Sequence, residues 1–360
     1  MKITALNHRV VSVPVQYPVI SSVRHNSQIV FVILDVLTSE GISGISYAQA
    51  FNIHGAKAIK SCLNYLEGIV IGEDPRDIEK IWRKNWETMK LLGLQGLPMF
   101  ALSMVDIALW DIFGKSVNLP VCRLLRGTPG AFDSYQSDGL WLVSALEAAK
   151  QAEEFAIMGF SSMKMRLGRK YMKEDIQVVA EIRKAVGENV EILADVNQGW
   201  IAEQAMNMEK HLLAAGIGWL EEPIEAENME GHSRLSDKMQ VRIATGENLY
   251  GVRPFQHFLQ MNAASVYTPD LQRIGGITGW IRINSLMEQY HILSGIHLFP
   301  EFAVHLFPII KYPVKLEWMG WAGALFKEPL KCEEGVVKTP DRPGFGFAWD
   351  EERIAQYQIE

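Results

Sequence analysis

The sequence predicts an α/β protein in which a (β/α)8-type barrel follows an α+β unit of about 120 residues. After Gly127, short apolar strands alternate with helical segments, which is typical of a parallel sheet covered by helices. Before that point, two or three strands rich in Val and Ile precede a run of helices. A doubly wound sheet would carry a Gly-rich phosphate loop after its first strand, and the sequence contains no G-x-G-x-x-G or Walker A motif.

The elements of the N-terminal unit follow from periodicity. Runs of Val and Ile predict strands at 2–16 and 28–38. Helical spacing of apolar residues predicts helices at 55–70, 76–93 and 97–117. The third of these helices is apolar on most sides, with Asp106 and Asp111 as interruptions.

The barrel elements are predicted in the same way. Helices Lys173–Val186 and Ala202–Ala215 are typical of the segments that separate the strands. The last forty residues lose the alternation and are rich in Gly, Pro and Trp, so we expect them to return to the first unit. Strands are expected at 159–166, 190–195, 216–221, 241–246, 264–269, 292–297 and 314–318.

Composition excludes several classes of function. The chain has 35 Lys and Arg against 42 Asp and Glu, a net charge of −7, which argues against nucleic acid or an anionic membrane as a partner. Cys62, Cys122 and Cys332 form no C-x-x-C pair, so we expect neither disulfides nor a cysteine zinc site. No apolar run reaches about 18 residues, and polar residues interrupt the N-terminus. We therefore expect a cytoplasmic enzyme or binding protein.

Carboxylates recur at one position in the barrel units. Asp195, Glu221, Glu247 and Asp270 each end a predicted strand, at intervals of 26, 26 and 23 residues. The carboxyl ends of barrel strands form the mouth where active sites lie. Three oxygen ligands from consecutive strands, Asp195, Glu221 and Glu247, describe a site for Mg²⁺ or Mn²⁺ rather than zinc. A single such residue could instead cap the helix that follows.

Two further pairs point to the same mouth. Lys164 and Arg166 lie two residues apart in a predicted strand, so they share a face, where buried cations need anions nearby. An exposed strand end is the alternative for this pair. His297 follows Asp270 by 27 residues, about one unit, and an aspartate beside a histidine is the arrangement of a general base.

These motifs resemble the enolase superfamily, mandelate racemase subgroup, over essentially the whole chain. The resemblance implies a (β/α)7β barrel with an N-terminal α+β capping domain, which the C-terminal segment completes. It implies domains at 1–125 (cap), 126–320 (barrel) and 321–360 (return to the cap). The matching motifs are AxxxVDIALWDIFGK, Lys164-Met165-Arg166, ADVNQ, WLEEP, GEN, PDLQRIGGITGW and HLF.

The resemblance also implies roles for the residues at the mouth. Mg²⁺ is expected as the cofactor, and abstraction of an α-proton from a hydroxy or sugar carboxylate, through a stabilised enediolate, as the chemistry. The metal ligands would be Asp195, Glu221 and Glu247, and Lys164 would help to hold the substrate carboxylate. His297, supported by Asp270, would move the proton.

Other matching positions would contact the substrate. Glu317 corresponds to a protonated acid that donates to the substrate carboxylate. Ser137 is expected near that carboxylate and Asn197 near the α-hydroxyl or the metal. Within the loop at 17–26, Val23 would suit an apolar group, whereas Arg24 and His25 would suit an anionic or polyhydroxylated one, unless that loop is only a surface hairpin.

The chain departs from the family where stereochemistry is decided. The second proton-transfer residue of the family is the second Lys of a K-x-K pair, but this sequence has Arg166, whose guanidinium resists deprotonation. Proton transfer on one face only favours an acid-sugar dehydratase, and a bidentate contact of Arg166 with a second carboxylate favours a diacid as its substrate. A racemase or epimerase remains the alternative. A catalytically silent barrel that binds metal or carboxylate and a Schiff-base aldolase using Lys164 are alternatives of other classes. The family resemblance further implies a homo-oligomer, from dimer to octamer.

Overall fold

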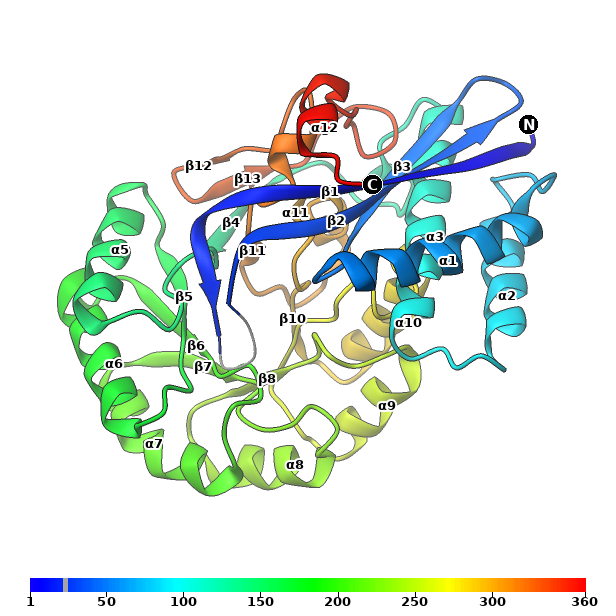
Figure 1. Ribbon diagram of the computed structural model, residues 1–360. Helices are drawn as coiled ribbons and strands as arrows, with labels where there is room; N and C mark the ends of the chain where they lie inside the picture. The colour runs from blue at the N-terminus through cyan, green and yellow to red at the C-terminus, as the bar shows by residue number, and fades with distance from the viewer. Residues whose placement is uncertain (22–24) are drawn as a thin grey trace.

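The computed structural model describes residues 1–21 and 25–360 and consists of a cap and a barrel (Figure 1). The cap begins with an antiparallel sheet in which the long strands β1 (Ile3–Ile20) and β2 (His25–Thr38) pair along most of their length. β2 also pairs with β3 (Ser43–Gln49). Strand β3 follows the Gly41 turn directly and runs toward the barrel, so its last residue, Gln49, reaches the site.

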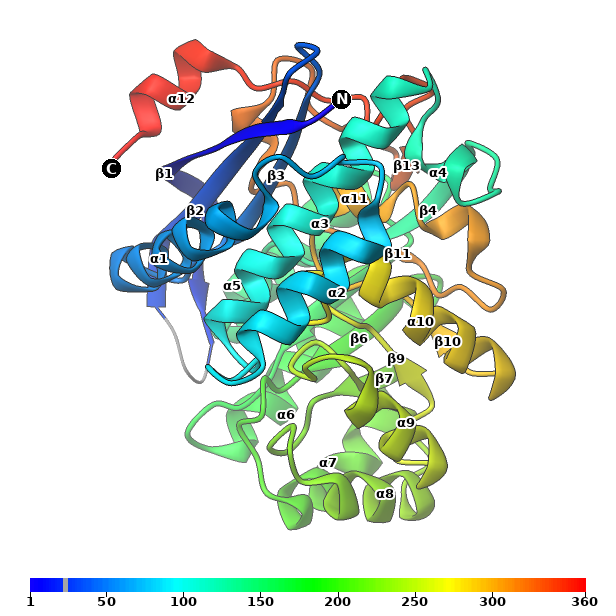
Figure 2. The same cartoon turned by 90° about the vertical axis from the view of Figure 1, so that its right-hand side faces the viewer.

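The helices of the cap pack against this sheet. They are α1 (Ile53–Val70), α2 (Ile78–Met89) and α3 (Leu97–Ser116). Helix α3 is long and apolar enough to cross a membrane, but 78% of its apolar window is buried inside the protein, which makes it a core helix. Figure 2 shows α2 and α3 side by side, with the barrel helix α10 (Gly276–Gln289) next to them.

The barrel confirms the predicted fold class. Neighbouring strands are parallel, and β11 (Leu316–Trp318) pairs with β4 (Ala131–Gln136) to close the circle. A parallel bridge between Ser294 and Pro313 joins the segment before β11 to β10. The remaining strands are β5 (Ser162–Arg166), β6 (Glu191–Asp195), β7 (Ile217–Glu221), β8 (Ile243–Thr245), β9 (Val266–Tyr267) and β10 (Leu293–Ser294).

Helices cover the outside of this barrel, as Figure 1 shows, and each connects one strand to the next. This is the (β/α)7β order, in which the last strand has no helix of its own before the chain leaves the barrel. Besides α10, these helices are α5 (Ala145–Ile157), α6 (Met172–Val186), α7 (Ala202–Ala214), α8 (Met229–Lys238), α9 (Val252–Gln260) and the short α11 (Pro300–Ala303).

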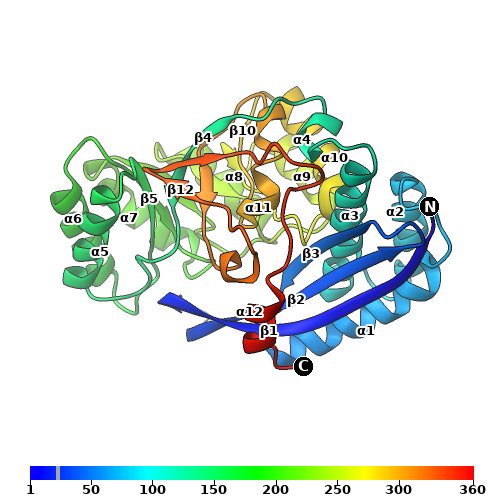
Figure 3. The same ribbon diagram turned by 90° about the horizontal axis from the view of Figure 1, so that it is seen from above.

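The C-terminal segment returns to the cap, and Figure 3 shows α12 (Glu351–Tyr357) beside β1. The Val10 backbone donates to the Glu360 carbonyl at 2.7 Å and accepts from Ile359 at 2.9 Å. On the way, β12 (Cys332–Glu333) and β13 (Val336–Lys338) form a hairpin that extends β4. The domain boundaries at 125 and 320 stay predictions.

Buried hydrogen bonds fix the cap on the barrel. The Tyr47 hydroxyl donates to Glu301 Oε2 at 2.5 Å, and the Gln49 backbone donates to Gln272 Oε1 at 3.1 Å. Deeper in the junction, Asp106 of α3 accepts from the backbone and the hydroxyl of Thr278 in α10, at 2.9 and 2.5 Å. These contacts place the ends of β1 and β3 over the mouth of the barrel.

Candidate active site

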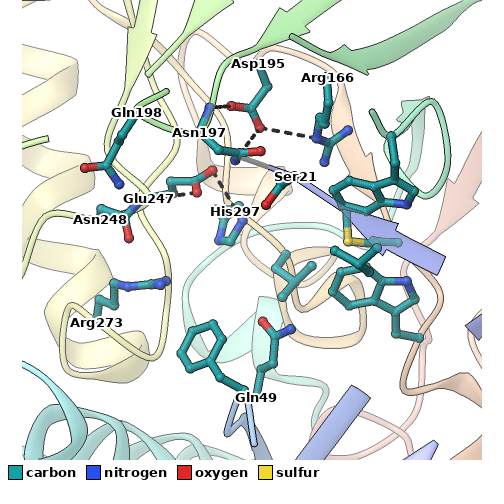
Figure 4. Close-up of a pocket in the computed structure, with 16 residues that line it drawn as sticks. Ser21, Gln49, Arg166, Asp195, Asn197, Gln198, Glu247, Asn248, Arg273 and His297 are labelled. Atoms are coloured by element: carbon teal, nitrogen blue, oxygen red, sulfur yellow. Dashed lines mark hydrogen bonds and ion pairs between the residues drawn. The ribbon is translucent and has the colours of Figure 1, made fainter. Parts of the chain in front are cut away.

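A pocket lies where the cap meets the carboxyl ends of the barrel strands (Figure 4). The cap contributes Val19, Ser21, Gln49 and Phe51 to its walls. The barrel contributes a polar set: Arg166, Asp195, Asn197, Gln198, Glu247, Asn248, Arg273 and His297. Trp141, Leu298, Met319 and Trp321 line an apolar side. The strand-end register therefore brings its predicted residues together.

The three predicted metal ligands are buried at this mouth. Asp195 ends β6, Glu221 ends β7, and Glu247 follows β8 by two residues. Cations hold two of them: Lys164 Nζ lies 2.9 Å from Glu221 Oε2, and Arg166 Nε lies 3.4 Å from Asp195 Oδ2. Within residues 1–21 and 25–360, no three His, Cys, Asp or Glu side chains already form a metal cluster. That the three carboxylates bind a metal stays a prediction.

The donor chemistry of these residues nevertheless fits a hard divalent cation. Glu247 Oε2 is buried without a hydrogen-bond partner among the described residues. Sequence reasoning missed Glu222, a fourth buried carboxylate, although it stands beside Glu221 in the WLEEP motif. Burial raises the pKa of Glu222 well above its usual range, and Glu247 and Asp195 raise it further. This excess of buried negative charge is what a divalent cation would neutralise.

Lys164 lies at the centre of an anionic cage in strand β5. Its Nζ is 2.9 Å from Glu221 and from Glu317, and 3.8 Å from Asp195. Burial alone would lower the pKa of Lys164, but Glu221 and Glu317 outweigh burial and hold it well above its usual value. A Schiff-base lysine must be neutral to attack a carbonyl, so this environment contradicts the aldolase alternative.

Glu317, in β11, lies among hydrogen-bond donors, and the protonated form that the family resemblance implies stays a prediction. Its Oε1 accepts from Ser137 Oγ at 2.7 Å, and its Oε2 accepts from the Leu298 backbone at 2.8 Å. Burial would raise the pKa of Glu317, but Lys164 and His297 bring it far below the usual range. Three donors around one carboxylate favour its ionised form. Ser137 thus contacts Glu317 in the structure.

Arg166 is held by hydrogen bonds from both Nη atoms. Its Nη1 donates to the carbonyls of Ser137 and Lys164, and its Nη2 donates to Ser137 Oγ, all at 3.1 Å. The guanidinium lies over the ring of Trp141, 4.3 Å from the ring centre. With both Nη atoms engaged, Arg166 is not positioned to bind a second substrate carboxylate bidentately.

His297 and Asp270 form the expected dyad. The His297 Nδ1 lies 2.8 Å from Asp270 Oδ2, and its Nε2 lies 3.4 Å from Glu247 Oε2. Burial would lower the pKa of His297, but Glu247 and the hydrogen bond to Asp270 raise it to about 9. Arg273 Nη1 donates to the same Asp270 oxygen at 2.6 Å, so Asp270 is fixed from two sides. Sequence reasoning did not single out Arg273, although it lies in the PDLQRIGGITGW motif.

The predicted substrate contacts divide into three groups. Asn197 lines the pocket and donates from its backbone and its side chain to Asp195, at 2.8 and 3.0 Å. His25 lies exposed at the start of β2 and is not among the residues that line the pocket, and its contact with a substrate stays a prediction. Val23 and Arg24 lie outside the described residues.

A (β/α)7β barrel with a cap and a ring of ionisable groups at its mouth defines an enzyme of the lyase or isomerase class. The chain belongs to the mandelate racemase/muconate lactonizing enzyme family of the enolase superfamily. Residues 4–126 match the family's N-terminal domain, and residues 147–353 match the enolase C-terminal domain-like family.

Named relatives cover nearly the whole chain. A 3,6-anhydro-alpha-L-galactonate cycloisomerase from Streptomyces coelicolor is 29% identical over 89% of each chain. An L-talarate/galactarate dehydratase from Salmonella typhimurium is 30% identical over 91% of this chain and 82% of its own. An N-succinyl-L-Arg/Lys racemase from Bacillus cereus is 29% identical over 100% and 98%.

A solved structure agrees with this fold. An enolase from alpha proteobacterium bal199, crystallised with bound magnesium, superimposes with a TM-score of 0.95 at 32% identity and covers 99% of both chains. The relatives thus include dehydratases, cycloisomerases and a racemase that share one architecture.

Proposed function

We propose that the protein is a Mg²⁺-dependent acid-sugar dehydratase, which removes the α-proton of a hydroxy or sugar carboxylate. The observation that carries the proposal is the pairing of one histidine base with one permanent cation. His297, backed by Asp270, lines the pocket, while Arg166 occupies the place of a second proton-transfer residue. A guanidinium stays protonated near neutral pH and so does not act as a base.

The metal would be held by Asp195, Glu221 and Glu247, and magnesium in the related structure supports this assignment. When bound, Mg²⁺ supplies Lewis-acid stabilisation of the negative charge that develops on the substrate carboxylate. Lys164 carries its positive charge beside the same carboxylates and would add a hydrogen bond to the substrate. Asn197 would orient the α-hydroxyl from its position next to Asp195.

The proton chemistry then belongs to His297. Its Nε2 accepts the α-proton as the carbon–hydrogen bond breaks, while Asp270 holds Nδ1 and stabilises the imidazolium. The imidazolium gives this proton to the β-hydroxyl, which leaves as water when the carbon–oxygen bond breaks. The resulting enol becomes a 2-keto-3-deoxy acid. The step is balanced because substrate equals product plus water, and one base is enough.

A screen of sugar acids tests this proposal. Aldonic and aldaric acids incubated with the Mg²⁺-loaded protein should give a 2-keto-3-deoxy product from at least one member. That product is detected as its semicarbazone and by mass, with loss of water. Racemisation of a simple α-hydroxy acid without any keto product would contradict dehydration and identify a racemase or epimerase.

A racemase or epimerase is the second candidate, and the apolar side of the pocket favours it. Trp141 and Trp321 stack with their ring centres 6.2 Å apart beside Met319, a wall that suits an apolar substrate group. A racemase among the relatives supports the same reading. Inversion of configuration in the recovered substrate would identify this reaction. A catalytically silent binding barrel would bind Mg²⁺ and acids but exchange no α-proton.

A further inference from the structure

The pocket has a second polar end, away from the carboxylates that would hold the metal. Figure 4 shows the Gln49 amide and the Arg273 guanidinium on the opposite side of His297 from Asp195 and Arg166. Gln49 comes from the end of β3 in the cap, and Arg273 from the loop that follows β9 in the barrel. The two domains therefore each contribute one polar side chain to this end.

Gln49 is a buried donor that the protein itself does not use. Its residue is 4% exposed, and its Nε2 has no hydrogen-bond partner among the residues that the structure describes. Its backbone is fixed by the hydrogen bond to Gln272, and the residue lines the pocket. Buried amide donors are nearly always paired, and an unpaired one at a pocket wall indicates a ligand acceptor.

Arg273 repeats this pattern with a full charge. It is 8% exposed, its Nη1 donates to Asp270, and its side chain also hydrogen-bonds Tyr250, whereas its Nε has no partner within residues 1–21 and 25–360. The rings of Phe51 and Phe100 lie 5.8 and 5.6 Å from the guanidinium carbon and flank it. A guanidinium held in this way presents its remaining donors in a fixed direction, which suits a carboxylate.

We propose that Gln49 and Arg273 form a subsite for the distal carboxylate of the substrate, which makes the preferred substrate a hydroxy diacid. The inference rests on the proposed function, because that function places the reacting carboxylate at the other end of the pocket. Arg166 does not fill this role, since its Nη atoms already donate to Ser137 and Lys164. Arg273 carries positive charge and no acceptor, so it selects an anion over a neutral hydroxyl.

Binding of unreactive acids to the Mg²⁺-loaded enzyme tests the subsite without turnover. Butyrate is glutarate with the second carboxylate replaced by a hydrogen atom, so the two acids differ only in that group. Calorimetry should find glutarate bound at least about tenfold more tightly than butyrate to the unmodified protein. In Gln49→Glu, a carboxylate would face Arg273 and the bound anion, and this preference should fall to about twofold or less.

Controls separate the subsite from general effects. Gln95→Glu makes the same charge change in the cap outside this pocket, and the preference for glutarate should persist. Gln49→Leu removes the amide without adding a charge, and the ratio of the two affinities should fall to about its square root. This variant replaces Gln49→Glu as the test if Gln49→Glu does not fold. Equal affinity for the two acids in the unmodified protein, or an unchanged preference in Gln49→Glu, would overturn the proposal.

Turnover separates this inference from the proposed function. The Gln49→Glu change should reduce kcat/KM for galactarate by about 10–100-fold and for galactonate by less than about threefold. If no acid is dehydrated but the binding preference depends on Gln49, the subsite stands and the function fails. If dehydration occurs with equal loss for both acids in Gln49→Glu, the function stands and the subsite is wrong.

Discussion

At the scale of single residues, Arg166 and His297 occupy the positions that decide how a proton could move. The Arg166 guanidinium is stacked on Trp141 and bonded through Ser137 and Lys164, so its environment preserves its charge. His297 has one nitrogen on Asp270, and its other nitrogen faces Glu247 at 3.4 Å. With one base and one fixed cation, the proposed mechanism acts from a single face of the substrate.

Arg166→Lys should therefore add the missing second base. A lysine at this position has a titratable amine, whereas the guanidinium is charged at all accessible pH values. We expect inversion at the α-carbon to rise at least about tenfold over the unmodified protein, at some cost to dehydration. Chiral chromatography of recovered substrate measures the inversion. Arg166→Met, which supplies no base, is the control, and equal inversion in both variants would contradict the single-base account.

His297→Asn should remove the base and leave the carboxylates in place. We expect kcat to fall by about 10²–10⁴, which is the usual contribution of a general base. Stabilisation of the variant by Mg²⁺ should persist, because Asp195, Glu221 and Glu247 are unchanged. Rates of product formation and thermal unfolding with and without Mg²⁺ measure the two effects. A variant that keeps full turnover would assign proton transfer to another residue.

The sequence was informative about residues at strand ends and silent about those placed by packing. Asp195, Glu221, Asp270 and His297 were predictable because barrel periodicity puts every strand end at one mouth. Gln49 and Arg273 were not, because their meeting depends on how β3 of the cap docks on the barrel, which no local pattern records. The exposed position of His25 likewise depends on the path of the cap strands.

At the scale of elements, the junction of α3 with α10 joins the cap to the barrel. Asp106 is buried at this junction and accepts two hydrogen bonds from Thr278. Burial raises the pKa of Asp106 to about 7, although these hydrogen bonds oppose the shift. The contact between cap and barrel thus involves a carboxyl group whose protonation depends on pH.

Stability should consequently fall as this group ionises. The folded protein binds the Asp106 proton more tightly than the unfolded chain, whose ordinary value is 3.8. The stabilisation is complete below about pH 4 and is lost as the pH rises through about 7. Urea denaturation at about pH 5.5 and about pH 8.5 should show a loss on the order of 1–4 kcal/mol, and Asp106→Asn should show a smaller one. An equal loss in the variant would assign the pH dependence to other groups.

Strand β4 was not predicted from the sequence, and its pairing explains why. Strand β4 has exposed or half-buried residues over its first half, and that half pairs with β13 from the C-terminal segment. Strand β4 is stabilised by pairing with β13, which lies about 200 residues further along the chain. Its own residues therefore show only a weak strand pattern. Helix α3, in contrast, was predictable because its length and apolar character need no partner to be recognised.

At the scale of the whole molecule, the net charge of −7 is unevenly distributed. Six buried carboxylates gather at the barrel mouth: Asp195, Glu221, Glu222, Glu247, Asp270 and Glu317. Lys164 and Arg166 balance them only in part. The free protein therefore contains an electrostatic strain that a bound divalent cation would relieve.

Addition of Mg²⁺ should stabilise the protein as a whole. At a concentration of about 100 times Kd, binding to the folded state alone contributes about 2.7 kcal/mol, which corresponds to a few degrees in Tm. Calorimetric scans with Mg²⁺ and with a chelator measure the difference. Glu247→Gln should reduce the shift because one anionic ligand is lost. No shift in the unmodified protein would contradict the metal site.

Two features of the molecule remain predictions: the cytoplasmic location and the homo-oligomer, from dimer to octamer. Exposed apolar side chains such as Leu91, which is 90% exposed, and Leu92 lie on the cap beyond the site. These side chains give the protein exposed apolar surface. Light scattering in solution would measure its oligomeric state.

The central claim is that His297 removes the α-proton of a bound acid. The most direct measurement is exchange of the α-proton in D₂O, followed by proton NMR, with Mg²⁺ and a panel of sugar acids. With the unmodified protein, we expect the α-proton signal to disappear and a deuterated 2-keto-3-deoxy product to form. With His297→Asn, we expect neither change. Retention of the α-proton in every acid that binds, with Mg²⁺ present, would contradict the central claim.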